Sequence, residues 1–221
     1  KDYFNSDRVI NVNNIFANNR LGINDSLEAG KSITLGLDFK KENIEDPNKF
    51  FELKLASVLR DKEENFIPKQ TTLNKKSSNI FGSISNNFIE FLDINYNFAI
   101  DNDLKSLEYS NFNAELKFNN LTTQLNFVEE SGEMGSANFI ENDTYFKFNE
   151  NNYFTFKTRR NKKLNLTEYY DLVYEYKNDC LTAGIKYKKT YYEDRDLKPS
   201  ENIFFTISLI PLTSYEQKIE R

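Results

Sequence analysis

Apolar and polar residues alternate with a period of two along most of this chain. The alternation is clearest at residues 92–100, where Leu92, Ile94 and Tyr96 are separated by polar residues. A period of two puts the apolar side chains on one face of a β-strand and the polar side chains on the other. The pattern therefore predicts about eleven or twelve strands and no helix. The other predicted strands lie at 33–39, 51–58, 79–88, 112–118, 121–127, 139–148, 153–160, 172–176, 181–187 and 203–209.

Short polar turns alternate with longer polar links between these segments. Residues 119–120 and 177–179 are short, whereas residues 61–76 and 193–201 are long. Short turns predict hairpins, and hairpins make consecutive strands antiparallel neighbours. The alternation is typical of outer-membrane barrels, which have tight periplasmic turns and longer outside loops. With a periplasmic C-terminus, the link at 193–201 lies outside.

Two all-β architectures produce this pattern. A transmembrane barrel turns its apolar face outward to lipid, while a soluble barrel or sandwich turns it inward. Most of the predicted strands are longer than the strands of sandwiches, which usually have about five or six residues. Their lengths approach the roughly 9 to 11 residues of a tilted membrane strand. Many polar positions carry Asp, Glu, Lys or Asn, as expected for a water-filled lumen. We therefore predict an antiparallel transmembrane β-barrel segment, with an outward set comprising Leu35, Tyr96, Leu116 and Phe205.

Two stretches depart from the alternation. Residues 1–30 are polar and irregular, and residues 8–12 are their best candidate for part of a strand. Near residues 56–58 the alternation slips, which predicts a β-bulge.

Composition narrows the possible functions. No apolar run approaches the roughly 20 residues of a membrane-spanning helix. The net charge of -5 comes from 34 acidic and 29 basic residues scattered together, so no basic stripe exists for nucleic acid. With no histidine and one cysteine, a Cys/His zinc site and an internal disulfide framework are excluded. We therefore expect no metal, no cofactor and no enzymatic activity.

Three stretches resemble a known family. Residues 168–212 contain Asn-Asp-Cys at 178–180, then a strand, then Asp-Arg-Asp-x-x-Pro-Ser at 194–200 and an apolar strand. Residues 59–63 followed by 77–82 form a second stretch. The third contains, in order, Arg20, Gly22, Asp25, Glu28 and Gly30. All three resemble the LPS-assembly outer-membrane protein family, LptD.

The resemblance implies a barrel of roughly twenty-six strands, preceded by a periplasmic jelly-roll and plugged by an LptE-like lipoprotein. Such proteins receive lipopolysaccharide from periplasmic bridge proteins and insert it into the outer leaflet of the outer membrane of Gram-negative bacteria. Residues 1–221 are then expected to be the C-terminal portion of that barrel, without the jelly-roll and the early strands. A porin-like passive channel and a soluble all-β binding module are the alternatives.

The family also implies a lateral gate between the first and the last strand of the barrel. The last strand predicted in this sequence is 202–210, and Ile203, Phe205, Ile207 and Leu209 are expected to face lipid. Thr206 and Ser208 are expected to face the lumen. An ordinary closing strand without special weakness is the alternative. The candidate gate residues are Asn202, Ile203, Phe204, Phe205, Thr206, Ile207, Ser208 and Leu209.

Cys180 matches a cysteine position of the family. The resemblance implies a disulfide from Cys180 to a cysteine in the N-terminal part of the protein. Many members carry an adjacent pair of cysteines where this chain has Cys180 and Leu181, so the connectivity stays open. A free thiol is the alternative for a lone cysteine in an exported protein.

Overall fold

The computed structural model describes residues 9–21, 28, 30–191, 199–209 and 213–220. Within these residues the chain forms twelve β-strands and one short 3₁₀ helix, Lys69–Thr71. The strands are β1 (Ser32–Glu42), β2 (Phe50–Arg60), β3 (Ile80–Ile89), β4 (Leu92–Ile100), β5 (Leu107–Phe118), β6 (Leu121–Glu130), β7 (Asn138–Lys147), β8 (Asn152–Asn161), β9 (Leu166–Lys177), β10 (Leu181–Thr190), β11 (Ser200–Leu209) and β12 (Thr213–Glu220).

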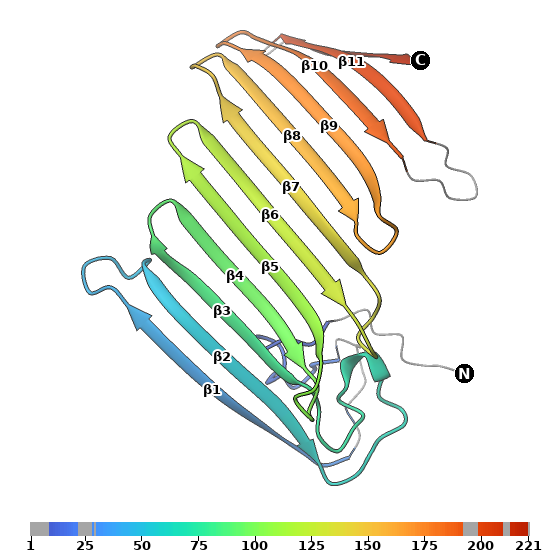
Figure 1. The fold of residues 1–221 in the computed structure, drawn as a ribbon. Coiled ribbons are helices and arrows are strands. Elements are labelled where there is room, and N and C mark those ends of the chain that lie inside the picture. Colours follow the sequence, from blue (N-terminus) through green and yellow to red (C-terminus); the bar gives the residue numbers. More distant parts are fainter. Residues whose placement is uncertain (1–8, 22–27, 29, 192–198, 210–212, 221) are drawn as a thin grey trace. The chain divides into compact units, whose positions relative to one another are not determined.

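The strands follow one another in chain order from β1 to β12 in one sheet (Figure 1). Each strand pairs with its sequence neighbour, so the sheet is a series of hairpins. All eleven predicted strands are present, and the prediction of an antiparallel all-β fold is confirmed. Among the described residues, no helix has the length and apolar character to span a bilayer.

The connections alternate largely as predicted. The turns at 90–91 and 119–120 are short, and the links at 61–79 and 131–137 are long. The polar stretch at 161–167 in the sequence predicts a longer link, but in the structure the link is the short segment 162–165.

The position of the twelfth strand, β12, was not predicted. The strand reads TSYEQKIE, and Tyr215 and Ile219 are its only large apolar residues. This alternation is too weak to identify a strand by itself. The strand is defined instead by its pairing with β11, which runs from Asn202 opposite Glu220 to Leu209 opposite Thr213.

The chain divides into two compact units. Unit 1 comprises residues 1–113 and 128–137, and unit 2 comprises residues 114–127 and 138–221.

In unit 1 the N-terminal segment packs on one face of the sheet. Ile10 lies just before a run of turns and Ile15 lies within it, and both side chains are buried. The Asn11 and Asn14 side chains hold the turn: Asn11 N donates to Asn14 Oδ1 at 2.9 Å, and Asn14 N to Asn11 Oδ1 at 3.3 Å. Such side-chain bonds compete with regular strand pairing. The prediction of part of a strand at 8–12 is therefore wrong for the described residues 9–12; Arg8 lies outside them.

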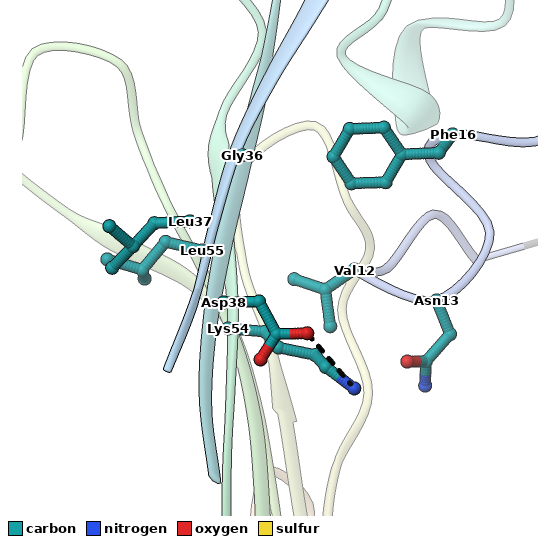
Figure 2. A pocket seen from close by; sticks show the side chains of 8 residues that line it. All are labelled: Val12, Asn13, Phe16, Gly36, Leu37, Asp38, Lys54 and Leu55. Atoms are coloured by element: carbon teal, nitrogen blue, oxygen red, sulfur yellow. Dashed lines mark ion pairs between the residues drawn. The ribbon is translucent and has the colours of Figure 1, made fainter. Parts of the chain in front are cut away.

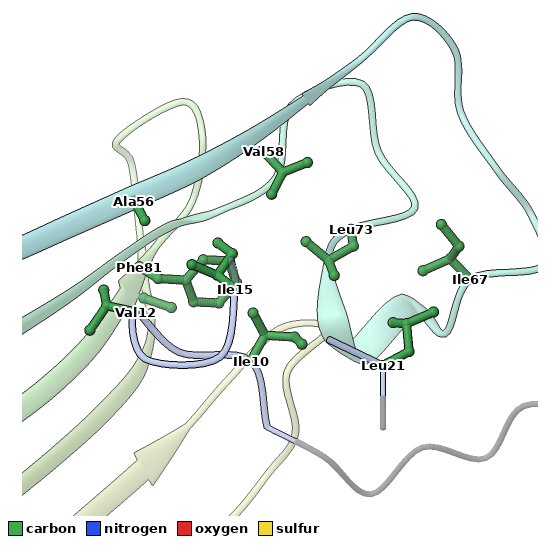
Figure 3. Packing of buried hydrophobic residues seen from close by; sticks show 10 residues of the cluster. Ile10, Val12, Ile15, Leu21, Ala56, Val58, Ile67, Leu73 and Phe81 are labelled. Carbon is green, nitrogen blue, oxygen red and sulfur yellow. The ribbon is translucent and has the colours of Figure 1, made fainter. Parts of the chain in front are cut away.

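The buried cluster joins this segment to the sheet and to the link 61–79 (Figure 3). Burying a side chain such as Ile15 contributes about 1.5 to 3 kcal/mol. The cluster comprises Ile10, Val12, Ile15, Leu21, Ala56, Val58, Ile67, Leu73, Phe81 and Ala99.

The predicted bulge at 56–58 is wrong. Strands β1 and β2 pair without a shift, from Ser32 opposite Arg60 to Glu42 opposite Phe50. Ala56 and Val58 interrupt the alternation because the N-terminal segment covers the otherwise polar face at that point. The irregularity in the sequence therefore reflects the burial of Ala56 and Val58, and the backbone register is unchanged.

The two faces of the sheet differ in chemistry within each unit. On β1 the apolar face carries side chains such as Leu35, which is 53% exposed, and on β11 it carries Phe205, which is 42% exposed. Tyr96 and Leu116 are half-buried. None of these four side chains lies in a sealed interior. This agrees with the prediction that they belong to an outward-facing set. We call the opposite side, which carries Asp38 in unit 1 and Lys157 in unit 2, the polar face.

Candidate functional site

A buried ion cluster fastens the N-terminal segment of unit 1 to the polar face. The Glu28 carboxylate lies between two guanidinium groups, bonding Arg20 Nε at 2.5 Å and pairing also with Arg60. The side chains of Arg20, Arg60 and Glu28 are 7%, 1% and 13% exposed. Charges this deeply buried are stable only when paired and hydrogen-bonded.

Further hydrogen bonds connect the cluster to neighbouring elements. Arg20 Nη1 donates to Thr34 Oγ1 at 2.8 Å, and Arg20 Nη2 donates to Ser32 Oγ at 3.0 Å, both on β1. Arg60 Nε donates to the Leu73 carbonyl at 2.5 Å. Burial lowers the pKa of the Arg20 guanidinium from its ordinary value. The cluster thus joins the N-terminal segment, β1, β2 and the link 61–79.

The second and third family-like stretches of the sequence meet in this region. Arg20 and Glu28 form the ion cluster, and Gly30 adopts a positive φ of 84°, which favours glycine. Gly22 and Asp25 lie outside the described residues. From the second stretch, Arg60 joins the cluster, and the Ser78 hydroxyl accepts a bond from Val58 N at 2.9 Å.

A pocket of about 360 Å³ lies between the N-terminal segment and β1–β2 (Figure 2). Phe16 forms one wall and lies against the backbone of Gly36, where an added Cβ would meet the Phe16 ring at 2.5 Å. Asp38 and Lys54 form the charged part of the lining, with 3.9 Å between Asp38 Oδ2 and Lys54 Nζ. The pocket therefore combines apolar and charged walls. Its lining is Val12, Asn13, Phe16, Gly36, Leu37, Asp38, Lys54 and Leu55.

In unit 2 the polar face carries a series of ion pairs between adjacent strands. Lys157 on β8 bonds Asp143 on β7 at 2.5 Å, and Lys186 on β10 bonds Asp171 on β9 at 3.1 Å. Arg159 bonds Glu141 at 3.3 Å and Glu168 at 2.8 Å. Partly exposed pairs of this kind contribute only about 0 to 1 kcal/mol each. Their main effect is to keep this face polar and hydrated.

The described residues contain no group of three or more acidic or cysteine side chains placed to hold a metal ion. The arrangement is that of a sheet with one apolar face and one face of paired charges.

Comparison with protein families identifies the chain. The model of the family "LptD: LPS transport system D" matches residues 3–138, which is more than half of the 221 residues. The chain belongs to the LptD family. The LptD match includes the ion cluster and the pocket, and it ends within β7. The resemblance of residues 168–212 lies beyond the matched part.

Other comparisons add less. No curated protein matches the chain. Two mutant forms of a porin from Rh. blastica are similar in structure, each at 8% sequence identity. One has a TM-score of 0.41 and covers 79% of this chain and 79% of the porin. The other has a TM-score of 0.43 and covers 86% and 84%.

Membership of the LptD family establishes the general role. The chain is a component of lipopolysaccharide transport in the bacterial outer membrane, and this role is transport and not enzymatic catalysis.

The predicted gate strand occupies an interior position. Residues Asn202 to Leu209 lie in β11, which pairs with β10 on one side and with β12 on the other. The prediction that 202–210 is the last strand is therefore wrong, and Ile210 lies outside the described residues. Thr206 pairs with Gly184, and Ser208 with Thr182, on the polar face. Side chains alternate between the two faces along a strand, so the apolar face of β11 carries Ile203, Phe205, Ile207 and Leu209.

Cys180 lies in the turn between β9 and β10. It is an exposed free thiol in the described chain. The Asn178 side chain holds the turn, since its Oδ1 accepts bonds from Cys180 N at 3.0 Å and Leu181 N at 2.8 Å.

Replacing Glu28 by Gln is expected to release the N-terminal segment. The substitution leaves two buried guanidinium groups without their shared carboxylate, at a cost of about 3 to 5 kcal/mol. Hydrogen exchange of residues 10–21, measured by mass spectrometry on the intact protein in micelles, should lose protection by roughly 10²-fold or more. The matched control is Glu42→Gln, which removes an exposed carboxylate paired with Lys40. Equal protection in the two variants would show that apolar packing alone holds the segment.

Proposed function

We propose that the twelve strands are part of a larger closed barrel, and that lipopolysaccharide leaves it sideways at the free edge of β12. The observation that carries the proposal is the weakly apolar sequence of β12, in which Tyr215 and Ile219 are the large apolar residues, on a strand that has one neighbour within the described residues. Family membership supplies the substrate class.

The edges of the sheet support the larger barrel. Backbone N–H and C=O groups left unpaired in hydrocarbon cost several kcal/mol each, so membrane barrels close on themselves. In the described chain β1 and β12 each have one strand neighbour. Further strands would pair with both edges. Residues 1–221 would then be the C-terminal portion of a barrel of roughly twenty-six strands.

The edge of β12 has the features of a weak seam. Its sequence, TSYEQKIE, has two large apolar residues, Tyr215 and Ile219. A strand with few apolar side chains makes fewer favourable contacts with the strand that closes the barrel. In the register with β11, Gln217 stands opposite Phe205 and interrupts the run of apolar residues. Parting this seam would therefore break fewer favourable contacts than parting an interior pair.

The headgroups and the acyl chains of the lipid would take different paths. Sugar-rich headgroups would pass along the polar face, where ion pairs such as Lys157–Asp143 keep the surface hydrated. Acyl chains would reach the membrane through the seam. A plug lipoprotein of the LptE type and periplasmic bridge proteins are the proposed partners, the plug contacting the polar face and the bridge delivering the lipid.

A disulfide between β11 and β12 should leave transport intact, because the proposed seam lies on the other edge of β12. Ser208 and Ser214 face each other in the register, and facing residues in antiparallel strands are close enough for a disulfide. Cells carrying the full-length protein with Ser208→Cys and Ser214→Cys should deliver lipopolysaccharide to the surface at the wild-type rate under oxidising conditions, as measured by surface labelling of newly made lipid.

The matched lock joins the other edge. A cysteine at Glu216, bonded to a cysteine on the strand that closes the barrel, should stop delivery until reductant is added. Arrest of delivery by the lock at 208 and 214 would place the seam between β11 and β12 and contradict the proposal.

We also propose that Cys180 forms a disulfide with a cysteine in another part of the protein. Its exposed position in a short turn, on the expected periplasmic side, suits an oxidising compartment. Cys180 should resist alkylation in the intact protein until reductant is added, as followed by peptide mass. Alkylation of Cys180 without reductant would show a free thiol.

A further inference from the structure

Two tyrosines stack on the polar face of unit 2. Tyr145 on β7 and Tyr153 on β8 have ring centroids 5.8 Å apart and ring planes 26° apart. The Tyr153 hydroxyl donates to the Glu150 carbonyl at 2.7 Å, which fixes that ring beside the turn. Tyr145 remains 40% exposed. The exposed Tyr145 ring, stacked on the partly buried Tyr153 ring, therefore leaves an aromatic surface open to water on a face that also carries ion pairs.

The cation beside this pair differs from its neighbours. Lys157 and Lys186 bond carboxylates on adjacent strands. Lys147 faces Tyr153 in the register, and its Nζ lies 6.0 Å from the Tyr153 ring centroid. Within the described part of the chain, Lys147 forms no ion pair. Its ammonium is thus available to an anion at the edge of the aromatic surface.

Aromatic rings and a free cation together fit one chemical class. The negative face of a tyrosine ring attracts the C–H groups on the flat side of a sugar ring. A lysine ammonium binds a phosphate as a point charge. Carboxylates such as Glu175, which faces Tyr153 in the register, can accept bonds from sugar hydroxyls. An apolar peptide would gain little from such a charged surrounding.

We propose that Tyr145, Tyr153 and Lys147 form a docking site for a phosphorylated sugar of the lipopolysaccharide headgroup. The site lies next to the short turn at 148–151, on the expected periplasmic side, where a headgroup would enter. The inference rests on the proposed function, because it assumes that headgroups pass along the polar face. It adds a defined contact at the start of that path.

Photocrosslinking tests the site directly. The full-length protein in micelles would carry a benzophenone amino acid at position 145 and be irradiated with purified lipopolysaccharide. A lipid adduct is expected. The phosphorylated oligosaccharide released from lipopolysaccharide by mild acid should displace it, and the dephosphorylated oligosaccharide should be about tenfold weaker. Lys147→Gln should weaken displacement by a similar factor, the loss expected for one hydrogen bond to a charged group.

The matched control places the benzophenone at Tyr174. That side chain is 42% exposed, on β9, and stands opposite Phe154 on the apolar face. Any adduct there should not respond to the oligosaccharide. An adduct at 145 that the oligosaccharide fails to displace, or equal displacement at both positions, would overturn the docking site. If that happens while the disulfide locks behave as expected, lateral release stands and only the docking site falls.

Discussion

The structure depends on the hydrogen-bond ladder of an antiparallel sheet whose side chains alternate between two solvents. Each strand from β2 to β11 has a neighbour on both sides. In hydrocarbon this pairing is the condition for a stable backbone, because no water can replace a missing partner. In a sheet whose backbone groups are all hydrogen-bonded, every second side chain of each strand points to the same face. The apolar and polar faces follow from that geometry.

Alternation in the sequence was sufficient to predict the sheet but not everything attached to it. Eleven strands could be located because each contains several apolar residues two apart, as in Ile33, Leu35 and Leu37. Strand β12 was missed because its sequence offers only Tyr215 and Ile219, and its pairing with β11 is a tertiary property. A periodic pattern reports the environment of a residue only when that environment is the same along the whole strand.

The N-terminal segment shows the same limit of local patterns. Ala56 and Val58 looked like a bulge because the residues that cover them, Ile10 and Ile15, are more than forty positions earlier in the sequence. The motif containing Arg20 and Glu28 was visible, whereas the contribution of Arg60 required the fold. Tyr145 and Tyr153 were visible only as strand residues. Their stacking arises from the diagonal placement of positions across β7 and β8.

The polar face serves different purposes in the two units. In unit 1 it is covered by a segment fixed through buried charges and apolar packing, with the Phe16 pocket beside it. In unit 2 it carries exposed ion pairs and an open aromatic surface. The covered part can hold a segment in place, while the open part can exchange its water for sugar hydroxyls and phosphates. Transport of an amphipathic lipid requires a surface of the second kind.

One face of this sheet is expected to meet hydrocarbon and the other to meet water. The chain has no tryptophan. The fluorescence of a single tryptophan introduced at 35, 37, 38 or 40 on β1 can therefore be measured as the difference between the variant and the parent protein. In bilayers containing brominated lipids, the tryptophans of Leu35→Trp and Leu37→Trp should be strongly quenched, and those of Asp38→Trp and Lys40→Trp should not. Equal quenching at all four positions, or quenching at none, would contradict the account.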